Sequence, residues 1–473
     1  MKWNAVVICL DTFRADFALQ EAPWEADLPT LARLRSESTV MTNAFGEGYP
    51  TIPMRRAYFT GEPSFPWRYT FDTKGMWPTG RGWHKIPPEE PTLAEVLLDA
   101  GYMTGLVADT YHMFKPTMNF TRGFASYEFV RGYESDNWKG GRVGAEELRP
   151  YVRDPARPED HPVLVQHLLN ARGRRSEADW SAARVFDRAR EWVNEQPEDR
   201  PFFLWVDSFS PHEPWDPPSR FVDRYMPDYR GKRFIYPVTG PDDFTTEEAD
   251  WVRSAYRGYL TFVDERLGRL FETLNRPGLA ERTIVFVLSD HGTELQEHGR
   301  FSKVASHLYA HNTRLVWFMR HPEVTGPKRY DGFVQSVDAA PTLCDMLGLP
   351  PLGSGVSLWP LMQGKVKDTG REHVISGWGS FASVRSHEWN YIVNFEEPDR
   401  FERLYRLSAD PMEQTDVLAW HPSEARALRE KLEGLLRQAL PAELPDRVEP
   451  SLAPIRRLFG AERAKVGKDS GFV

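Results

Sequence analysis

Four apolar runs in this 473-residue chain each end in an aspartate, and one of these is followed at once by a histidine. Functional side chains collect beyond the carboxyl ends of parallel strands, so such runs place their acids along one edge of a sheet. Gly292, after Asp290 and His291, permits the tight turn that lets both side chains reach one metal ion. With Asp11 as a third ligand, we expect a metal site at this edge. The four aspartates are Asp11, Asp109, Asp207 and Asp290.

A set of short motifs, spread over nearly the whole chain, carries a family resemblance. The segment Thr51-Ile52-Pro53-Met54-Arg55, followed by Thr60-Gly61, resembles the sulfatase signature C/S-x-P-x-R…T-G. Leu10–Asp16 is similar to the family's N-terminal motif, and Ser289–Gly299 is similar to its S-D-H-G-E-x-L-x-E-H-G motif. Later family motifs are matched, in the family's order, by Pro211–Trp215, Val337–Leu343 and Leu404–Pro411.

The resemblance implies a role for each matching residue. Thr51 would be the nucleophile and would share the metal with the three ligands already named, while Arg55 would orient the nucleophile and the substrate oxyanion. Cations aimed at the oxygens of a tetrahedral anion stabilise the charge of its transition state, and a departing alkoxide needs an acid. His212 and Lys303 would contact the non-bridging oxygens or protonate the leaving group. The metal ligands would be Asp11, Thr51, Asp290 and His291.

Three positions depart from the sulfatase pattern. Thr51 stands where the family has a Cys or Ser that is oxidised to formylglycine, a modification that threonine cannot take. Thr12 stands where many sulfatases have a second metal-binding Asp. The usual G-K-W-H segment reads Asp109-Thr110-Tyr111-His112, so the lysine that helps to cage sulfate is missing. We expect Thr110, Tyr111 and His112 to contact the substrate in its place.

The ligand set indicates the kind of metal. Two carboxylates and an imidazole favour one divalent ion such as Mn²⁺ or Zn²⁺, with Fe²⁺ also suited and Mg²⁺ or Ca²⁺ left open. The set resembles that of phosphonate monoester hydrolases and phosphodiesterases of the superfamily. Threonine-dependent relatives hold a second metal, which Asp207 and His212 could begin to bind. Their spacing is one residue longer than that family's, so a single-metal site is the prediction.

These features predict a metal-dependent hydrolase that cleaves phosphodiester or phosphonate-type esters through Thr51. Water can attack a phospho-threonine at phosphorus, whereas a sulfo-threonine resolves more slowly. Two alternatives stay open: a sulfatase that acts on sulfuric esters through Thr51, and an inactive sulfatase-like binding protein. The expected partner is a small anionic ester. Aromatic segments at Trp67–His84, Tyr111–Phe124 and around Trp215 suggest an apolar or sugar-like leaving group.

Apolar strand-like runs alternate with amphipathic helical patterns, which predicts an α/β protein with a mostly parallel sheet flanked by helices. The family resemblance implies that this fold is alkaline phosphatase-like. A small C-terminal antiparallel sheet with a packed helix is expected after it. Strands are predicted at Ala5–Leu10, Met103–Ala108, Phe202–Val206, Thr283–Leu288 and Leu315–Met319, then near Ala382–Arg385, Tyr391–Asn394 and Arg403–Leu407. Helices are predicted at Pro29–Glu37, Thr92–Ala100, Asp179–Glu195, Glu247–Leu274 and Ser423–Leu440.

The composition sets the remaining expectations. The chain divides into a catalytic domain (1–350), an α+β subdomain (351–450) and an arm (451–473) that is either flexible or packs on another subunit of a homo-oligomer. A net charge of -9 disfavours nucleic acid or an anionic membrane as partner. No signal peptide or membrane-spanning run is recognised, so we expect a cytoplasmic protein. Cys9 and Cys344 lie in apolar runs, where inert thiols are more common than a disulfide.

Overall fold

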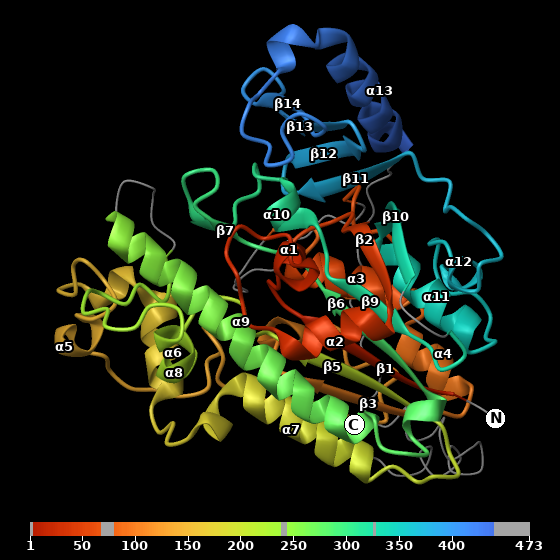
Figure 1. Cartoon of the computed structure of the whole chain (residues 1–473), viewed down its shortest axis with the longest axis horizontal. Helices are drawn as coiled ribbons and strands as arrows, with labels where there is room; N and C mark the ends of the chain where they lie inside the picture. Colours follow the sequence, from red (N-terminus) through yellow and green to blue (C-terminus); the bar gives the residue numbers. More distant parts are fainter. Residues whose placement is uncertain (1–2, 68–79, 238–243, 325–327, 439–473) are drawn as a thin grey trace, which may run out of the picture.

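The structure is a computed structural model that describes residues 3–67, 80–237, 244–324 and 328–438. A central eight-stranded sheet is flanked by helices, and a small sheet with its own helix sits at one end (Figure 1). The order of the large sheet is β10-β2-β9-β6-β1-β5-β3-β4, and only β9 runs antiparallel to its neighbours. The predicted α/β fold with a mostly parallel sheet is therefore confirmed.

The strands of this sheet are β1 (Asn4–Leu10), β2 (Thr39–Phe45), β3 (Met103–Ala108), β4 (Ser126–Phe129), β5 (Phe202–Ser208), β6 (Thr283–Ser289), β9 (Trp317–Arg320) and β10 (Lys328–Gln335). The five strands predicted in this region are all present. The strands β2, β4 and β10 were not predicted. A two-stranded ribbon, β7 (Glu294–Leu295) with β8 (Phe301–Ser302), follows the Asp290-His291 turn.

Side chains of β1 alternate between two cores, as the period of a strand requires. Val6, Ile8 and Leu10 pack on one face with α2, α7 and α9, whereas Ala5, Val7 and Cys9 pack on the other face with α3, α4 and α11. The helices are α1 (Ala15–Leu19), α2 (Pro29–Glu37), α3 (Thr51–Thr60), α4 (Leu93–Asp99), α5 (Ala145–Leu148), α6 (Pro162–Ala171), α7 (Ser181–Asn194), α8 (Ser219–Asp223), α9 (Thr246–Leu274), α10 (Ala310–Thr313), α11 (Ala339–Met346) and α12 (Trp359–Met362).

The start of the long helix α9 follows from local sequence. The Thr245 side chain accepts a hydrogen bond from the backbone N–H of Glu248 at 3.2 Å, and the Glu248 carboxylate accepts one from the N–H of Thr245 at 2.8 Å. This capping box satisfies two backbone donors that a helix start leaves unpaired. None of the helices in the described ranges is long and apolar enough to cross a membrane. Cys9 and Cys344 are buried and unbonded, as predicted.

The small sheet is antiparallel, in the order β11 (His373–Trp378), β12 (Phe381–Ser386), β13 (Trp389–Asn394) and β14 (Glu402–Arg406). Helix α13 (Pro422–Gln438) covers it through Leu428 and Leu432, which pack on Val384 and Leu404. Three of these strands and the helix were predicted; β11 was not. The predicted arm 451–473 lies outside the described residues.

The segment between β2 and α3 is hydrogen-bonded to the small sheet. The N–H of Gly377 donates to the carbonyl of Glu47 at 2.8 Å, and the N–H of Tyr49 donates to the carbonyl of Gly377 at 2.9 Å. The Ser376 hydroxyl donates to the carbonyl of Gly46 at 2.6 Å. Two residues after Tyr49 the chain reaches Thr51, so the small sheet fixes the approach to the predicted nucleophile.

Glu47 in this junction makes stability depend on pH. Burial raises the pKa of Glu47 to about 7, although its carboxyl accepts hydrogen bonds from the Ser336 hydroxyl and the Ser64 N–H. Because the folded state holds this proton more tightly, the stabilisation is complete below the ordinary pKa and is lost as pH rises through about 7. We expect Glu47→Gln to gain about 3 kcal/mol relative to the parent between pH 4 and pH 8 in urea unfolding. The exposed Glu198→Gln should show no such gain; an equal pH profile for parent and Glu47→Gln contradicts the prediction.

Candidate active site

Adjacent parallel strands bring three predicted metal ligands together. In the pairing of β1 with β6, Leu10 lies opposite Ser289, so the next residues, Asp11 and Asp290, meet at the carboxyl edge. One ligand atom from each of Asp11, Asp290 and His291 lies within 4.8 Å of the others, and all three side chains are buried. The N–H of Thr12 donates to Asp290 at 3.0 Å, which orients that carboxylate.

The donor atoms of this cluster fit a divalent metal. His291 Nδ1 lies 2.9 Å from the carbonyl of Gly292, so this nitrogen carries the hydrogen and Nε2 keeps its lone pair. Nε2 is buried with no hydrogen-bond partner, 3.7 Å from Asp11 and 3.5 Å from Asp290. Burial lowers the pKa of His291 to about 4 in spite of Asp290, so the ring is neutral at pH 7. Burial and Asp290 raise the pKa of Asp11, a repulsion that a cation between the carboxylates relieves.

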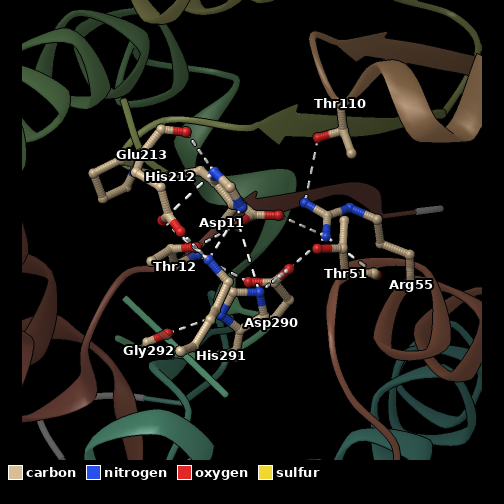
Figure 2. A network of polar contacts seen from close by, with 12 residues as sticks. Asp11, Thr12, Thr51, Arg55, Thr110, His212, Glu213, Asp290, His291 and Gly292 are labelled. Atoms are coloured by element: carbon tan, nitrogen blue, oxygen red, sulfur yellow. Dashed lines mark hydrogen bonds and ion pairs between the residues drawn. The ribbon is translucent and has the colours of Figure 1, made fainter. Parts of the chain in front are cut away.

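Arg55 joins three carboxylates, and Figure 2 shows its guanidinium beside Thr51 and Thr110. Its Nη1 is 2.5 Å from Asp290 and 3.0 Å from Asp11, and its Nε and Nη2 bind Asp207 at 3.0 and 2.7 Å. All four side chains are fully buried. Three carboxylates against one guanidinium leave two negative charges, which a divalent cation balances.

Thr51 is the first residue of α3 and lies beside Arg55 and Asp290 (Figure 2). Arg55 Nη1, which binds Asp290, also donates to the Thr51 carbonyl at 3.2 Å, so one nitrogen ties the helix start to the carboxylate cluster. Free backbone N–H groups give a helix start a partial positive charge that favours anions. Thr51 is therefore a buried hydroxyl at an anion-attracting helix end next to the candidate metal ligands.

His212 and Lys303 form a proton-bearing pair. His212 Nδ1 lies 2.6 Å from the Glu213 carbonyl, so it is a donor and leaves Nε2 as acceptor. The Lys303 ammonium lies 3.1 Å from that Nε2. Burial lowers the pKa of His212, and Lys303 adds to the effect although Glu213 opposes it. A neutral imidazole that accepts from an ammonium suits the predicted role, in which the pair supplies a proton to a leaving group.

Glu213 holds this pair in place and was not predicted from the sequence. Both of its carboxylate oxygens bind Lys303, at 2.9 and 3.0 Å, and one also accepts from the Ser302 hydroxyl at 2.5 Å. Burial alone would raise the pKa of Glu213, but His212 and Lys303 hold it well below its usual range. Its place between His212 and Pro214 in a recognised motif was the available signal; its partner is 90 positions away.

The predicted substrate-binding segment divides between two networks. The Thr110 hydroxyl donates to Asp207 at 2.5 Å and lies 3.3 Å from Arg55 Nη2, so it faces the catalytic centre. The Tyr111 hydroxyl instead donates to Glu134 at 2.5 Å. His112 is buried between aromatic rings, with its Nδ1 unpartnered. Contact of these three side chains with a substrate stays a prediction.

The other two strand-end aspartates have different partners. Asp109 accepts from the N–H of Phe209 at 2.5 Å, and Asp207 is occupied by Arg55, Thr110 and the indole of Trp205. Within the described parts of the chain, no second group of three His, Cys, Asp or Glu side chains comes close enough to hold a metal. Asp207 and His212 therefore form no such group there, which favours the single-metal prediction.

Comparison with known proteins places the chain in a family. The model of the family described as Sulfatase matches residues 3–349, most of the chain. The protein belongs to the sulfatase family. Arylsulfatase K of Bos taurus is 24% identical over 482 residues, which cover 92% of this chain and 81% of the relative.

Two solved structures share the fold of this sulfatase-family protein. The phosphonate monoester hydrolase of Agrobacterium radiobacter superposes with a TM-score of 0.71 at 20% identity, over 93% of this chain and 96% of the other. A protein bound to its substrate D-glucosamine-2-N,6-O-disulfate gives a TM-score of 0.68 at 17% identity, over 93% and 98%. These likenesses support the alkaline phosphatase-like fold.

One aromatic side chain suggested as a pocket wall lies elsewhere. Trp215 of this sulfatase-family protein is fully buried, packs on Tyr256 and donates to the carbonyl of Pro211 at 3.0 Å. Its ring stabilises the loop that carries His212 and cannot line a substrate pocket. Much of the predicted wall at Trp67–His84 lies outside the described residues.

Replacing Glu213 by Gln is expected to lower kcat about 10-fold, because Lys303 keeps a neighbour of the same shape but loses its negative partner. Ser302→Ala, which removes a hydrogen bond to Glu213 but no charge, is the matched control. A kcat in Glu213→Gln equal to that of the parent contradicts this positioning role.

Proposed function

We propose that this sulfatase-family hydrolase cleaves phosphodiester or phosphonate-type esters and that Thr51 is its nucleophile. One observation carries the proposal: a hydroxyl that cannot become formylglycine stands at the start of α3, tied through Arg55 Nη1 to the Asp11–Asp290–His291 cluster. A hydroxyl in such a place can attack phosphorus directly. The loss of the formylglycine precursor then changes the route of the reaction without removing the nucleophile.

The metal site of the proposal consists of this chain's own donors. Asp11, Asp290 and the Nε2 of His291 would hold the ion, and the Thr51 hydroxyl would complete the set. A divalent ion there lowers the pKa of the nucleophilic hydroxyl and polarises an oxygen of the ester. An imidazole among the donors favours Mn²⁺ or Zn²⁺ over Ca²⁺.

The residues around the cluster then share the work of the reaction. The Thr51 hydroxyl loses its proton to solvent, its oxygen forms a bond to phosphorus, and the bond to the leaving alkoxide breaks. Lys303, paired with His212, gives that alkoxide a proton. Arg55 and the N-terminus of α3 stabilise the charge on the non-bridging oxygens. Water then attacks phosphorus, and the bond between phosphorus and the Thr51 oxygen breaks. The Thr51 oxygen regains a proton from the attacking water through solvent, and Lys303 regains its proton from solvent.

A sulfuric ester is the second candidate substrate, because arylsulfatase K is a relative over 92% of this chain. One argument counts against a sulfuric ester. A sulfated formylglycine releases sulfate when its hemiacetal collapses, whereas a sulfated threonine has no such route. Both candidate substrates would present a tetrahedral anionic ester group to the site. A panel of substrates separates the candidates.

The test is hydrolysis of aryl phosphodiester, phosphonate monoester and sulfate substrates with Mn²⁺, Zn²⁺ and Mg²⁺. The proposal predicts that a phosphorus ester has a kcat/KM at least about 100-fold above that of the aryl sulfate. A preference for sulfate selects the second candidate. Absence of turnover with every substrate and metal overturns the proposal and indicates a binding protein.

Metal content gives a check that is independent of turnover. We expect about one divalent ion per chain after dialysis against Mn²⁺ or Zn²⁺, and less than about a tenth of this in His291→Ala, because a buried donor is lost. Metal should also raise the Tm of the parent but not of the variant. His298→Ala is the control, since this histidine stacks on Tyr309 outside the cluster. Equal metal content in His291→Ala and the parent contradicts the assigned site.

A further inference from the structure

A cavity of about 1100 Å³ lies at the carboxyl ends of β3 and β4. Small-molecule sites have volumes of about 300–1,000 Å³, so it can hold a group of several rings. Its wall includes Tyr111, which directly follows the Thr110 of the Arg55 network. The proposed function leaves this cavity without a role.

Aromatic rings form one side of the cavity. Phe114 and Phe129 stack with their centroids 4.3 Å apart and their planes at 9°, and Tyr111 continues the wall. Flat hydrophobic surfaces of this kind favour aryl groups or the apolar faces of sugar rings. The cavity is therefore suited to a ring system, not to a small aliphatic group.

The cavity also carries a lysine that makes no close ion pair with any carboxylate of the described residues. Arg131 is neutralised by Asp136, which it binds through two contacts of 2.8 and 2.7 Å. Lys115 lies 5.4 Å from the Tyr111 ring centroid, and no carboxylate of the described residues lies within 4.0 Å of its ammonium. Burial lowers the pKa of Lys115 to about 8 although the more distant Glu134 opposes the shift, so its charged form still gains from a closer anionic partner.

The strand at the cavity and the strand that carries Asp11 belong to the same sheet. The strands β4 and β1 are separated by β3 and β5, which makes three strand spacings, or about 14 Å. Tyr111 and Glu134 link the cavity wall to His212: the Tyr111 hydroxyl binds Glu134, whose other oxygen is 4.0 Å from His212 Nδ1. The cavity therefore borders the residues that would protonate a leaving group.

We infer that this cavity is a leaving-group subsite for a substrate of at least two rings that carries a second anionic group, which Lys115 binds. The second anionic group can be a carboxylate, a sulfate or a phosphate, because the lysine ammonium acts as a point charge and does not require one geometry of its partner. The inference rests on the proposed ester hydrolysis, because only that reaction makes the bound group a leaving group. Binding to the cavity can nevertheless be tested without turnover. It deepens the proposed function by naming the substrate class as an extended ester with two anionic groups.

The test measures binding of two free phenols, 4'-hydroxybiphenyl-4-carboxylate and uncharged 4-hydroxybiphenyl, to the intact protein by calorimetry. We expect the carboxylate to bind about 10-fold tighter in the parent, and the difference to disappear in Lys115→Met. Lys115→Arg keeps the charge and should keep the difference. Lys365→Met, at an exposed lysine remote in sequence from the cavity, should also keep it. Thermal melting of each variant shows that it is folded.

The outcomes separate the two proposals. Equal affinity for both phenols in the parent, or a difference that survives in Lys115→Met, overturns the subsite. If the difference depends on Lys115 while no biphenyl ester is hydrolysed, the subsite stands and the proposed hydrolysis fails. If both esters are hydrolysed, the carboxylated one should have a KM about 10-fold lower, and Lys115→Met should remove that advantage.

Discussion

Replacing Thr51 by Ala is expected to lower kcat on a phosphorus ester by at least about 10³-fold, because the variant keeps the fold and the metal donors but has no hydroxyl to attack. Thr51→Ser keeps the hydroxyl and should stay within about 10-fold of the parent. Single-turnover kinetics with an aryl ester give both values. Intact mass must show that the serine of this variant is not oxidised to formylglycine.

The covalent step adds a second readout. During turnover the parent should carry a mass increase on the peptide that contains Thr51, whereas Thr51→Ala should carry none. An adduct on any other residue, or full activity in Thr51→Ala, contradicts the assignment of the nucleophile. Metal content should stay close to that of the parent, since Asp11, Asp290 and His291 remain.

Arg55→Met is expected to destabilise the protein by about 3–5 kcal/mol, because three buried carboxylates lose their guanidinium. The effect should be largest without metal. Excess Mn²⁺ or Zn²⁺ should restore part of the stability, since an added cation offsets charge left between Asp11 and Asp290. Urea unfolding of both proteins, with a chelator and with metal, measures the difference.

An exposed arginine provides the matched control. Arg400 is 76% exposed and binds Glu397 at 3.0 Å, so Arg400→Met should change the free energy of unfolding by less than about 0.5 kcal/mol. If Arg55→Met lies within about 1 kcal/mol of the parent without metal, Arg55 is not the charge that holds these carboxylates together.

The large sheet could be predicted where strands are buried on both faces and read as continuous apolar runs. Strand β2 escaped this criterion because Thr39, Thr42 and Asn43 interrupt its apolar pattern. Thr42 and Asn43 bind the Asp331 side chain and carbonyl of the neighbouring strand β10, at 2.5 and 2.7 Å. Those partners are nearly 300 positions away, so local sequence carries no trace of them.

The convergence of Asp11, Asp290 and His291 was predictable because neighbouring parallel strands end at one edge. The role of Asp207 was not, since it depends on Arg55 reaching that edge from α3 and binding the carboxylate through two nitrogens. Glu213 was missed for the same reason: its function is defined by Lys303, which comes from a distant loop. Motifs identify the residues, and packing decides their partners.

The hydrogen bonds between Gly46–Tyr49 and Ser376–Gly377 have an evolutionary consequence. The small sheet is hydrogen-bonded to the segment that leads to Thr51, so it helps to position the proposed nucleophile and is not an independent module. Grafting the corresponding region of a relative would have to preserve these main-chain contacts, or the start of α3 would lose its alignment. Drift in the C-terminal strands is therefore constrained by chemistry that takes place at the edge of the other sheet.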